Sequence, residues 1–246
     1  MPAGEALLWQ AVWESGSGAV LDGAAALVAC GLTGFRPEVI DVALPSRSRG
    51  HALSGVRLRR RRELGPCLDV GVPRTRPEAA TVRAAQWAKS DRQAALVICL
   101  VVQQRLVRPE RLLAQWLAQT RSPRRAFLHA VIRDVCDGVH SLGELDFARL
   151  CRARGLPEPS RQEVRVQRDG RAYLDVAWDD LGLVVEVDGG HHGLALNPVD
   201  DALRQNEVVL SASRVLRIPV IGLRLDADAF MDQVVRAHHL LSGQAA

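Results

Sequence analysis

The sequence predicts an α/β protein in two parts: a smaller, mostly helical α+β region over residues 1–125 and an α/β sandwich over residues 126–246. The chain has 246 residues, 48% of them apolar and 24% charged, which suits one large domain or two modest ones with real cores. A helical pattern dominates residues 77–136. After it the expected order is helix, three strands, helix, strand, helix, as in an α/β sandwich.

Capping residues and alternation define the elements of the front region. Asp22 and Gly31 are expected to begin and end a helix over residues 22–30. Residues 38–44 alternate between two faces in the way that is typical of a strand. The other elements expected here are a helix over residues 5–13, a strand over residues 55–60, and helices over residues 92–106 and 109–117.

The rear region is expected to begin with a helix over residues 142–153, which ends before Gly155 and Pro157. Three strand-like runs follow, and Asp200 or Asp201 then caps a helix that continues to about residue 211. The remaining elements expected here are strands over residues 163–167, 171–178, 183–188 and 214–219 and a last helix over residues 226–241.

Composition excludes several classes of protein. No apolar run approaches the ~20 residues that a membrane span needs. The first residues lack the basic segment of a signal peptide. The five cysteines are an odd number without a C-x-x-C pair, which argues against a disulfide framework and against a cysteine zinc site. The sequence therefore favours a cytoplasmic protein with no membrane partner.

Charge is distributed unevenly along the chain, whose formal net charge is +4. Residues 1–140 contain 20 Lys and Arg against 12 Asp and Glu, a net charge of +8, whereas residues 141–246 contain 12 against 16, a net charge of −4. A basic front half is typical of proteins that contact phosphate backbones. Lys89 is the only lysine, however, and such an excess of arginine is also typical of a GC-rich genome. The run Arg59–Arg62 is either a phosphate contact or a solvated strand end.

The most informative stretch is an acidic hairpin. Side chains alternate faces along a strand, so a two-residue turn at Asp180-Leu181 would place Asp175 directly opposite Glu186. The same register pairs Tyr173 with Asp188. Cross-strand neighbours lie about 4.5–5.5 Å apart at Cβ. The hairpin therefore brings the carboxylates to one face of the sheet.

Three carboxylates close together inside apolar strands are unfavourable unless something offsets their repulsion. A divalent cation can do so. Mg²⁺ takes oxygen ligands from one or two carboxylates and completes its shell with water and substrate phosphate. The alternative is that this face is exposed to solvent and that the acids are ordinary surface residues.

With their neighbours, these residues resemble the PD-(D/E)XK nuclease superfamily, and most of all its very-short-patch-repair-like (Vsr-like) endonuclease domain. The resemblance covers about residues 140–242. It implies a restriction-endonuclease-like sandwich of a mixed sheet with flanking helices. It also implies hydrolysis of phosphodiester bonds by Mg²⁺, or by Mn²⁺ as a substitute, with Asp175 and Glu186 as metal ligands. The matching residues, in order, are Glu144, Pro157, Gln162, Asp175, Glu186-Val187-Asp188-Gly189, His192, Asp201, Arg204, Asn206 and Val215-Leu216-Arg217.

The resemblance implies roles for four further residues, each with a structural alternative. Glu144 is expected to be an outer metal ligand or to orient water, unless it is an ordinary helix acid. His192 is expected to be a general base or a phosphate contact, although a lone loop histidine is more often neither. Arg204 and Arg217 either bind the scissile phosphate or act as counter-ions of the acids.

One position departs from the superfamily pattern. Asp188 stands where the superfamily name places lysine, and Lys89, the only lysine of the chain, is not a plausible substitute. One possibility is that Asp188 acts as an additional metal ligand. Another is that His192 or Arg204 supplies the polar group that the lysine would otherwise provide. The remaining alternative is an inactive site.

The front half has a resemblance of its own. Residues 6–90 are similar to the C-terminal region of the type IV (AbiEi-family) antitoxins. The similar pieces are Gly23-Ala24-Ala25-Ala26-Leu27, Gly31-Leu32, the strand Val39 to Leu44, the arginine strand near Arg57 and Val72-Pro73. For the basic strand itself, the expectation is a non-specific phosphate contact rather than a separate sequence-reading module.

Together these observations predict a metal-dependent endonuclease whose partner is nucleic acid, with DNA as the expected substrate. The alternative is a non-catalytic nucleic-acid-binding regulator or antitoxin-like protein that uses the nuclease fold as a scaffold.

Overall fold

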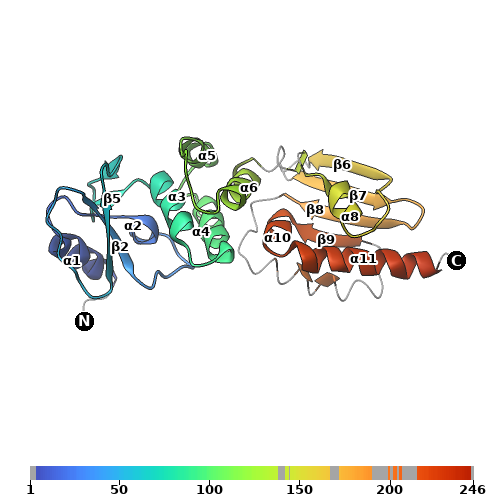
Figure 1. Cartoon of the computed structure of the whole chain (residues 1–246), viewed down its shortest axis with the longest axis horizontal. Helices are drawn as coiled ribbons and strands as arrows, with labels where there is room; N and C mark the ends of the chain where they lie inside the picture. The colour runs from blue at the N-terminus through green and yellow to red at the C-terminus, as the bar shows by residue number, and fades with distance from the viewer. Residues whose placement is uncertain are drawn as a thin grey trace. The chain divides into compact units, whose positions relative to one another are not determined.

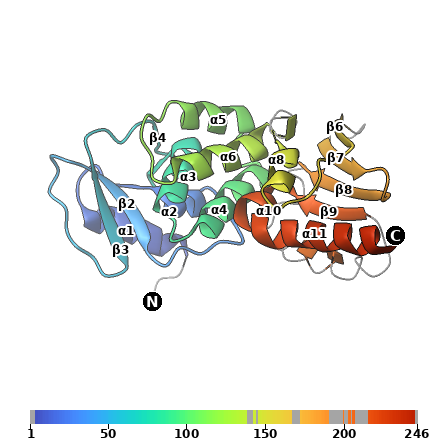
Figure 2. The ribbon, with the colours of Figure 1, turned by 45° about the vertical axis from the view of Figure 1, so that its right-hand side comes forward.

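The computed structural model describes residues 4–137, 142–143, 145–166, 172–189, 199, 202–203, 205–206 and 215–244. The chain divides into two compact units, Met1–Leu128 and His129–Ala246 (Figures 1 and 2). The sequence places this division after residue 125. Each unit contains a mixed sheet together with helices, so the predicted α/β class is confirmed.

The first unit contains a five-stranded sheet in the order β3-β2-β1-β5-β4. Its strands are β1 (Val20–Leu21), β2 (Ile40–Pro45), β3 (Val56–Arg61), β4 (Cys67–Leu68) and β5 (Arg74–Thr75). The two long strands, β2 and β3, are those that the sequence predicts, and they pair in parallel. Three strands of two residues are missed, because alternation cannot be recognised over so short a run.

Four helices of the first unit begin at a capping residue or at a proline. The Asp22 carboxylate accepts a hydrogen bond from the Gly23 amide at 2.8 Å, and the Ser90 hydroxyl accepts one from the Gln93 amide at 3.1 Å. A proline opens two further helices. The helices are α1 (Glu5–Ser15), α2 (Gly23–Ala29), α3 (Pro77–Trp87), α4 (Asp91–Gln103) and α5 (Pro109–Leu117), while α6 (Arg125–Cys136) crosses into the second unit.

The second unit contains a four-stranded sheet in the order β6-β7-β8-β9. Neighbouring strands are antiparallel from β6 to β8, and β9 runs parallel to β8. The strands are β6 (Arg161–Val166), β7 (Ala172–Trp178), β8 (Leu183–Asp188) and β9 (Val215–Pro219), and the helices are α8 (Phe147–Arg152), α10 (Val220–Leu225) and α11 (Ala227–Gln244).

One face of this sheet forms the core of the second unit. The rings of Trp178 on β7 and His238 on α11 are 5.7 Å apart, which places α11 against this face. The apolar side chains buried here on the strands are Leu174, Val176, Trp178, Leu183, Val185, Val187, Leu216 and Ile218. Because side chains alternate along a strand, the acidic residues are left on the opposite face.

Two predictions for helices in this unit need correction. The predicted helix over residues 142–153 is interrupted, because Leu145 and Asp146 are not helical. The Asp146 carboxylate accepts a hydrogen bond from the Arg149 amide at 2.8 Å, and α8 begins there. Helix α10 is missed, since it follows β9 directly at Pro219 without an intervening polar turn. Most of the helix expected from residue 200 or 201 lies outside the described residues.

Gly222→Ala is expected to lower the free energy of unfolding by about 1–3 kcal/mol. A Cβ atom at Gly222 in α10 would lie 2.5 Å from Cε2 of Phe230, whose side chain is fully buried and cannot move without disturbing the core. Gly243→Ala is the matched control, because its Cβ would meet nothing within 4 Å and the helix gains propensity. Urea unfolding of both variants tests this, and equal midpoints would contradict it.

Candidate functional site

The acidic hairpin has the predicted register. Asp175 on β7 pairs with Glu186 on β8, and Tyr173 pairs with Asp188. The turn covers residues 179–182, where Gly182 adopts a positive φ of 61° that favours glycine. Local alternation and a short turn are sufficient to fix this arrangement. The prediction that the carboxylates share one face of the sheet is therefore confirmed.

This face is neither core nor open surface. The side chain of Asp175 is 14% exposed and that of Glu186 is 32% exposed. The interpretation of the acids as ordinary surface residues therefore does not fit Asp175. A carboxylate with so little contact with water needs a cation or several hydrogen-bond donors nearby.

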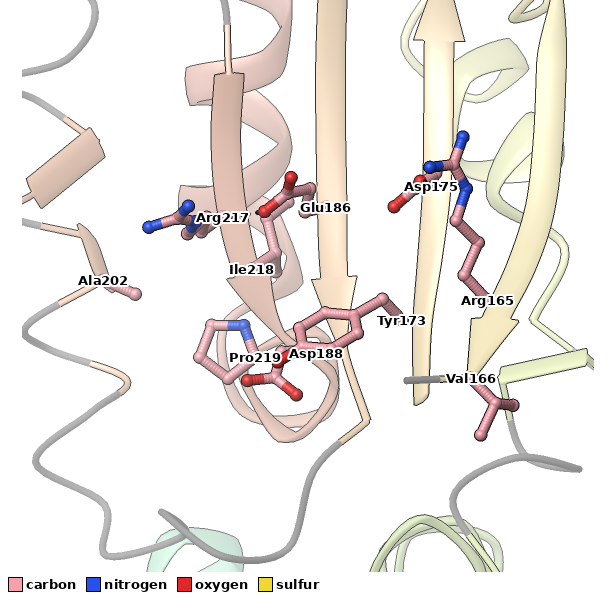
Figure 3. Close-up of a pocket in the computed structure, with 10 residues that line it drawn as sticks. All are labelled: Arg165, Val166, Tyr173, Asp175, Glu186, Asp188, Ala202, Arg217, Ile218 and Pro219. Atoms are coloured by element: carbon pink, nitrogen blue, oxygen red, sulfur yellow. Dashed lines mark hydrogen bonds and ion pairs between the residues drawn. The ribbon is translucent and has the colours of Figure 1, made fainter. Parts of the chain in front are cut away.

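Each of the two paired acids contacts an arginine from an outer strand. Nε of Arg165 on β6 lies 2.8 Å from Oδ2 of Asp175, and Nε of Arg217 on β9 lies 3.0 Å from Oε2 of Glu186 (Figure 3). Arg217 is therefore the counter-ion that the sequence offers as one alternative. Arg165 is missed by sequence reasoning. Arg165 pairs with Tyr173 across β6 and β7. Extending the predicted strand pairing from β7 and β8 to β6 and β7 would therefore have located it.

A pocket of about 720 Å³ opens on this face. Figure 3 shows Asp188 beside Pro219 and the ring of Tyr173, and the Asp175–Glu186 pair farther along the strands. Both arginines also line it, and their side chains are 58% and 74% exposed. The pocket is lined by Arg165, Val166, Tyr173, Asp175, Glu186, Asp188, Ala202, Arg217, Ile218 and Pro219.

Asn206 supports the outer edge of this site. Its side-chain amide donates to the carbonyl of Arg217 at 2.9 Å and accepts from the amide of Arg217 at 3.1 Å, so it pairs with β9 as a further strand would. It also donates to the side chain of Gln233 at 3.0 Å, which in turn donates to the carbonyl of Leu203 at 2.9 Å. Asn206 and Gln233 are both buried, so this network fixes β9 where it carries Arg217.

Other residues of the predicted ordered set have structural contacts. Nε2 of Gln162 donates to the carbonyl of Leu145 at 2.8 Å, and the carbonyl of Pro157 accepts from Nε1 of Trp178 at 3.2 Å. Three predicted site residues, Glu144, His192 and Arg204, lie outside the described residues.

The carboxylates of the acidic pocket fit the predicted cation only in part. Among the described residues, no group of three His, Cys, Asp or Glu side chains could hold a metal ion. Asp188 lies two residues along β8 from Glu186, about 7 Å farther along the strand. The three carboxylates predicted as ligands therefore do not form one metal-binding group. The Asp175–Glu186 pair still fits Mg²⁺, which needs only one or two carboxylates and keeps several waters.

Comparison of the chain with protein-family models, with curated proteins and with solved structures finds no match in any of the three. In the part of the chain that the structure describes, no helix has the length and apolar character needed to cross a membrane. The functional interpretation therefore depends on the site itself.

Proposed function

We propose that the protein is a metal-dependent endonuclease of the PD-(D/E)XK type, which hydrolyses phosphodiester bonds in DNA. One observation carries the proposal: Asp175 and Glu186 lie directly opposite each other on one wall of a pocket of about 720 Å³. The mixed sheet from β6 to β9, with α11 on its apolar face, agrees with a restriction-endonuclease-like sandwich. We propose a cytoplasmic location, since the five cysteines, all within the described part of the chain, form no disulfide.

Asp175 and Glu186 would hold the divalent cation. When bound, that cation lowers the pKa of a coordinated water and polarises a phosphoryl oxygen. Asp188 lies in the same pocket, where it can accept a hydrogen bond from a water of the metal shell. In this proposal an acid, rather than the superfamily lysine, would lie beside the attacking water.

The two arginines then have two successive roles. Without metal and substrate they neutralise the carboxylates, which would otherwise repel each other. Both guanidinium groups are more than half exposed, so water can solvate them once a cation binds the carboxylates, and their displacement costs little. Released guanidinium groups present planar forks that match a phosphate. Arg165 and Arg217 would thus bind the scissile phosphodiester after the metal has taken their carboxylates.

The direct test incubates supercoiled plasmid with the purified full chain and Mg²⁺ or Mn²⁺. Nicked and linear products are expected only with the metal, and EDTA should abolish them. Cleavage that persists unchanged in a variant carrying both Asp175→Ala and Glu186→Ala would refute the assigned residues.

Mn²⁺ is expected to stabilise the folded protein, because a metal that binds only the folded state raises the free energy of unfolding by about 2.7 kcal/mol at one hundred times its Kd. The measurement is the thermal midpoint of the full chain with and without Mn²⁺. Glu186→Gln should remove most of the shift. Glu158→Gln, which alters an exposed acid outside the pocket, should keep it. An equal shift in both variants would place the metal elsewhere.

A second candidate is a nucleic-acid-binding regulator that does not cleave. The observation in its favour is that both central carboxylates already have an arginine partner, while the acid at position 188 replaces the lysine. This candidate predicts retardation of DNA in a gel without any metal and no cleavage under any cation. The plasmid assay and a gel-shift assay in EDTA therefore separate the two candidates.

A further inference from the structure

A second arginine-rich site lies in the first unit, on the edge strand β3. A pocket of about 710 Å³ opens there, which we call the Trp87 pocket. Alternation along β3 places Arg59 and Arg61 on one face, together with Trp87 at the end of α3. The pocket is lined by Leu58, Arg59, Arg60, Arg61, Arg62, Glu63 and Trp87.

Arg59 is held from two sides. Its Cζ lies 4.0 Å from the centre of the Trp87 ring, which is a cation–π contact. Its Nε donates to Oδ1 of Asp41 at 2.9 Å. No acceptor among the described residues takes a hydrogen bond from its two terminal nitrogens. These contacts fix the plane of the guanidinium and leave its outer donors available.

Arg61 is held less completely. Its Cζ lies 5.5 Å from the centre of the Trp87 ring. Its Nε is 3.5 Å from Oδ2 of Asp22, and in the described part of the chain this buried nitrogen has no hydrogen-bond partner. Asp22 cannot fully compensate the charge of Arg61, because its Oδ2 also accepts a hydrogen bond from Arg83 at 2.8 Å. Burial and the nearby charge of Arg83 lower the pKa of Arg61, which is the expected effect of insufficient negative charge.

The surroundings favour a long anion over a single ion. Four arginines follow one another, three at the end of the edge strand β3 and Arg62 directly after it, and Arg60 and Arg62 are exposed. Residues 1–128 contain 19 Lys and Arg against 10 Asp and Glu. A row of arginine forks beside an aromatic ring is typical of surfaces that follow a nucleic-acid backbone.

We propose that the Trp87 pocket is a nucleic-acid contact in which Arg59 and Arg61 bind backbone phosphates. It is separate from the acidic pocket of the second unit, and the proposal does not depend on cleavage. It assigns to the first unit a role in holding the polynucleotide. Contacts to phosphate carry no sequence information, so this binding is expected to be non-specific.

The experiment measures the affinity of the full chain for a fluorescein-labelled 20-nucleotide single strand and for its duplex, by fluorescence anisotropy over a range of KCl concentrations. EDTA is present throughout, so that cleavage does not interfere. The test variant carries Arg59→Gln and Arg61→Gln. Its affinity is expected to fall at least about tenfold, and its salt slope for the single strand should become shallower by about 1.4, since each phosphate contact contributes about 0.7.

Two further variants keep the test decisive. Arg59→Lys with Arg61→Lys retains both positive charges and keeps a cation beside Asp41, so this variant should fold and keep the salt slope. Its affinity should still fall, because lysine lacks the planar fork of a guanidinium group. Arg36→Gln with Arg121→Gln removes the same charge from exposed positions outside the pocket and should change the affinity little.

Three results would overturn the proposal. The first is an equal loss of affinity in the Arg36/Arg121 variant, which would mean diffuse attraction. The second is unchanged affinity in the Arg59/Arg61 glutamine variant when its thermal unfolding confirms the fold. The third is displacement of DNA by polyglutamate of matched charge as effectively as by unlabelled oligonucleotide, which would indicate an acidic protein as the partner.

Discussion

Asp175→Asn is expected to lower Mg²⁺-dependent DNA cleavage by about 10²–10³-fold, because a lost metal ligand removes several kcal/mol of transition-state stabilisation. The amide keeps the shape of the side chain but not its negative charge. Asp175 is the more buried of the two paired acids, at 14% exposure of its side chain, so bulk water cannot readily replace it as a ligand. The measurement is the initial rate of plasmid nicking at saturating Mg²⁺.

Asp179→Asn is the matched control for this substitution. Asp179 lies in the turn that follows β7, and its side chain is 62% exposed. It does not line the acidic pocket. The control removes the same charge from the same hairpin, so its cleavage rate should stay within about twofold of the unaltered protein. Equal losses in both variants would point to a general charge effect and would contradict the assignment of Asp175.

The same pair of variants also tests the role of the arginines. When Asp175 becomes neutral, Arg165 loses its partner at 2.8 Å and its guanidinium becomes available to phosphate. DNA binding in EDTA should therefore become equal or tighter in Asp175→Asn while cleavage falls. A combined loss of binding and cleavage would instead show that the ion pair holds the fold of the pocket.

The acidic hairpin could be predicted from the sequence because only local rules determine it. A short turn and a period of two fix every cross-strand pair between β7 and β8. The arginine partner of Glu186 could not be predicted in the same way. Arg217 reaches Glu186 through a parallel pairing across a long connection, whose register depends on tertiary packing. The sequence therefore left open whether Arg217 is a counter-ion or a phosphate ligand.

Polar residues with structural roles were also difficult to interpret. Asn206 belongs to the ordered set on which the resemblance depends, yet its contacts are with the backbone of Arg217 at the edge of β9. A side chain that pairs with the backbone of an edge strand leaves no recognisable pattern in the sequence around it. Asp146 shows the opposite case, because it is a common capping residue that lies within a longer helical pattern.

Asp22→Ala is expected to lower the free energy of unfolding of the first unit by about 3–5 kcal/mol, the cost of breaking a buried ion pair from one side. Asp22 is fully buried. Its Oδ1 accepts hydrogen bonds from the Gly23 amide at 2.8 Å and from Oγ1 of Thr75 at 2.9 Å. Its Oδ2 accepts from Arg83 at 2.8 Å and lies 3.5 Å from Nε of Arg61. Alanine would leave the two guanidinium groups without this shared counter-ion.

Asp22→Asn separates the two contributions of this side chain. The amide oxygen can still cap α2 and accept from Thr75, so this part of the stability should remain. What is lost is the negative charge that faces Arg83 and Arg61. The asparagine variant should therefore unfold at a urea concentration between those of the unaltered protein and of Asp22→Ala. Asp69→Ala, at an exposed position, should shift the midpoint little.

The same series links the stability of the first unit to its proposed contact with nucleic acid. Without the Asp22 charge, Arg61 is less constrained beside Trp87, and the Trp87 pocket becomes more positive. Asp22→Asn should therefore bind single-stranded DNA at least as tightly as the unaltered protein under conditions in which it stays folded, although it unfolds more easily. Weaker binding by the folded variant would show that the orientation of Arg61, rather than its charge, determines the contact.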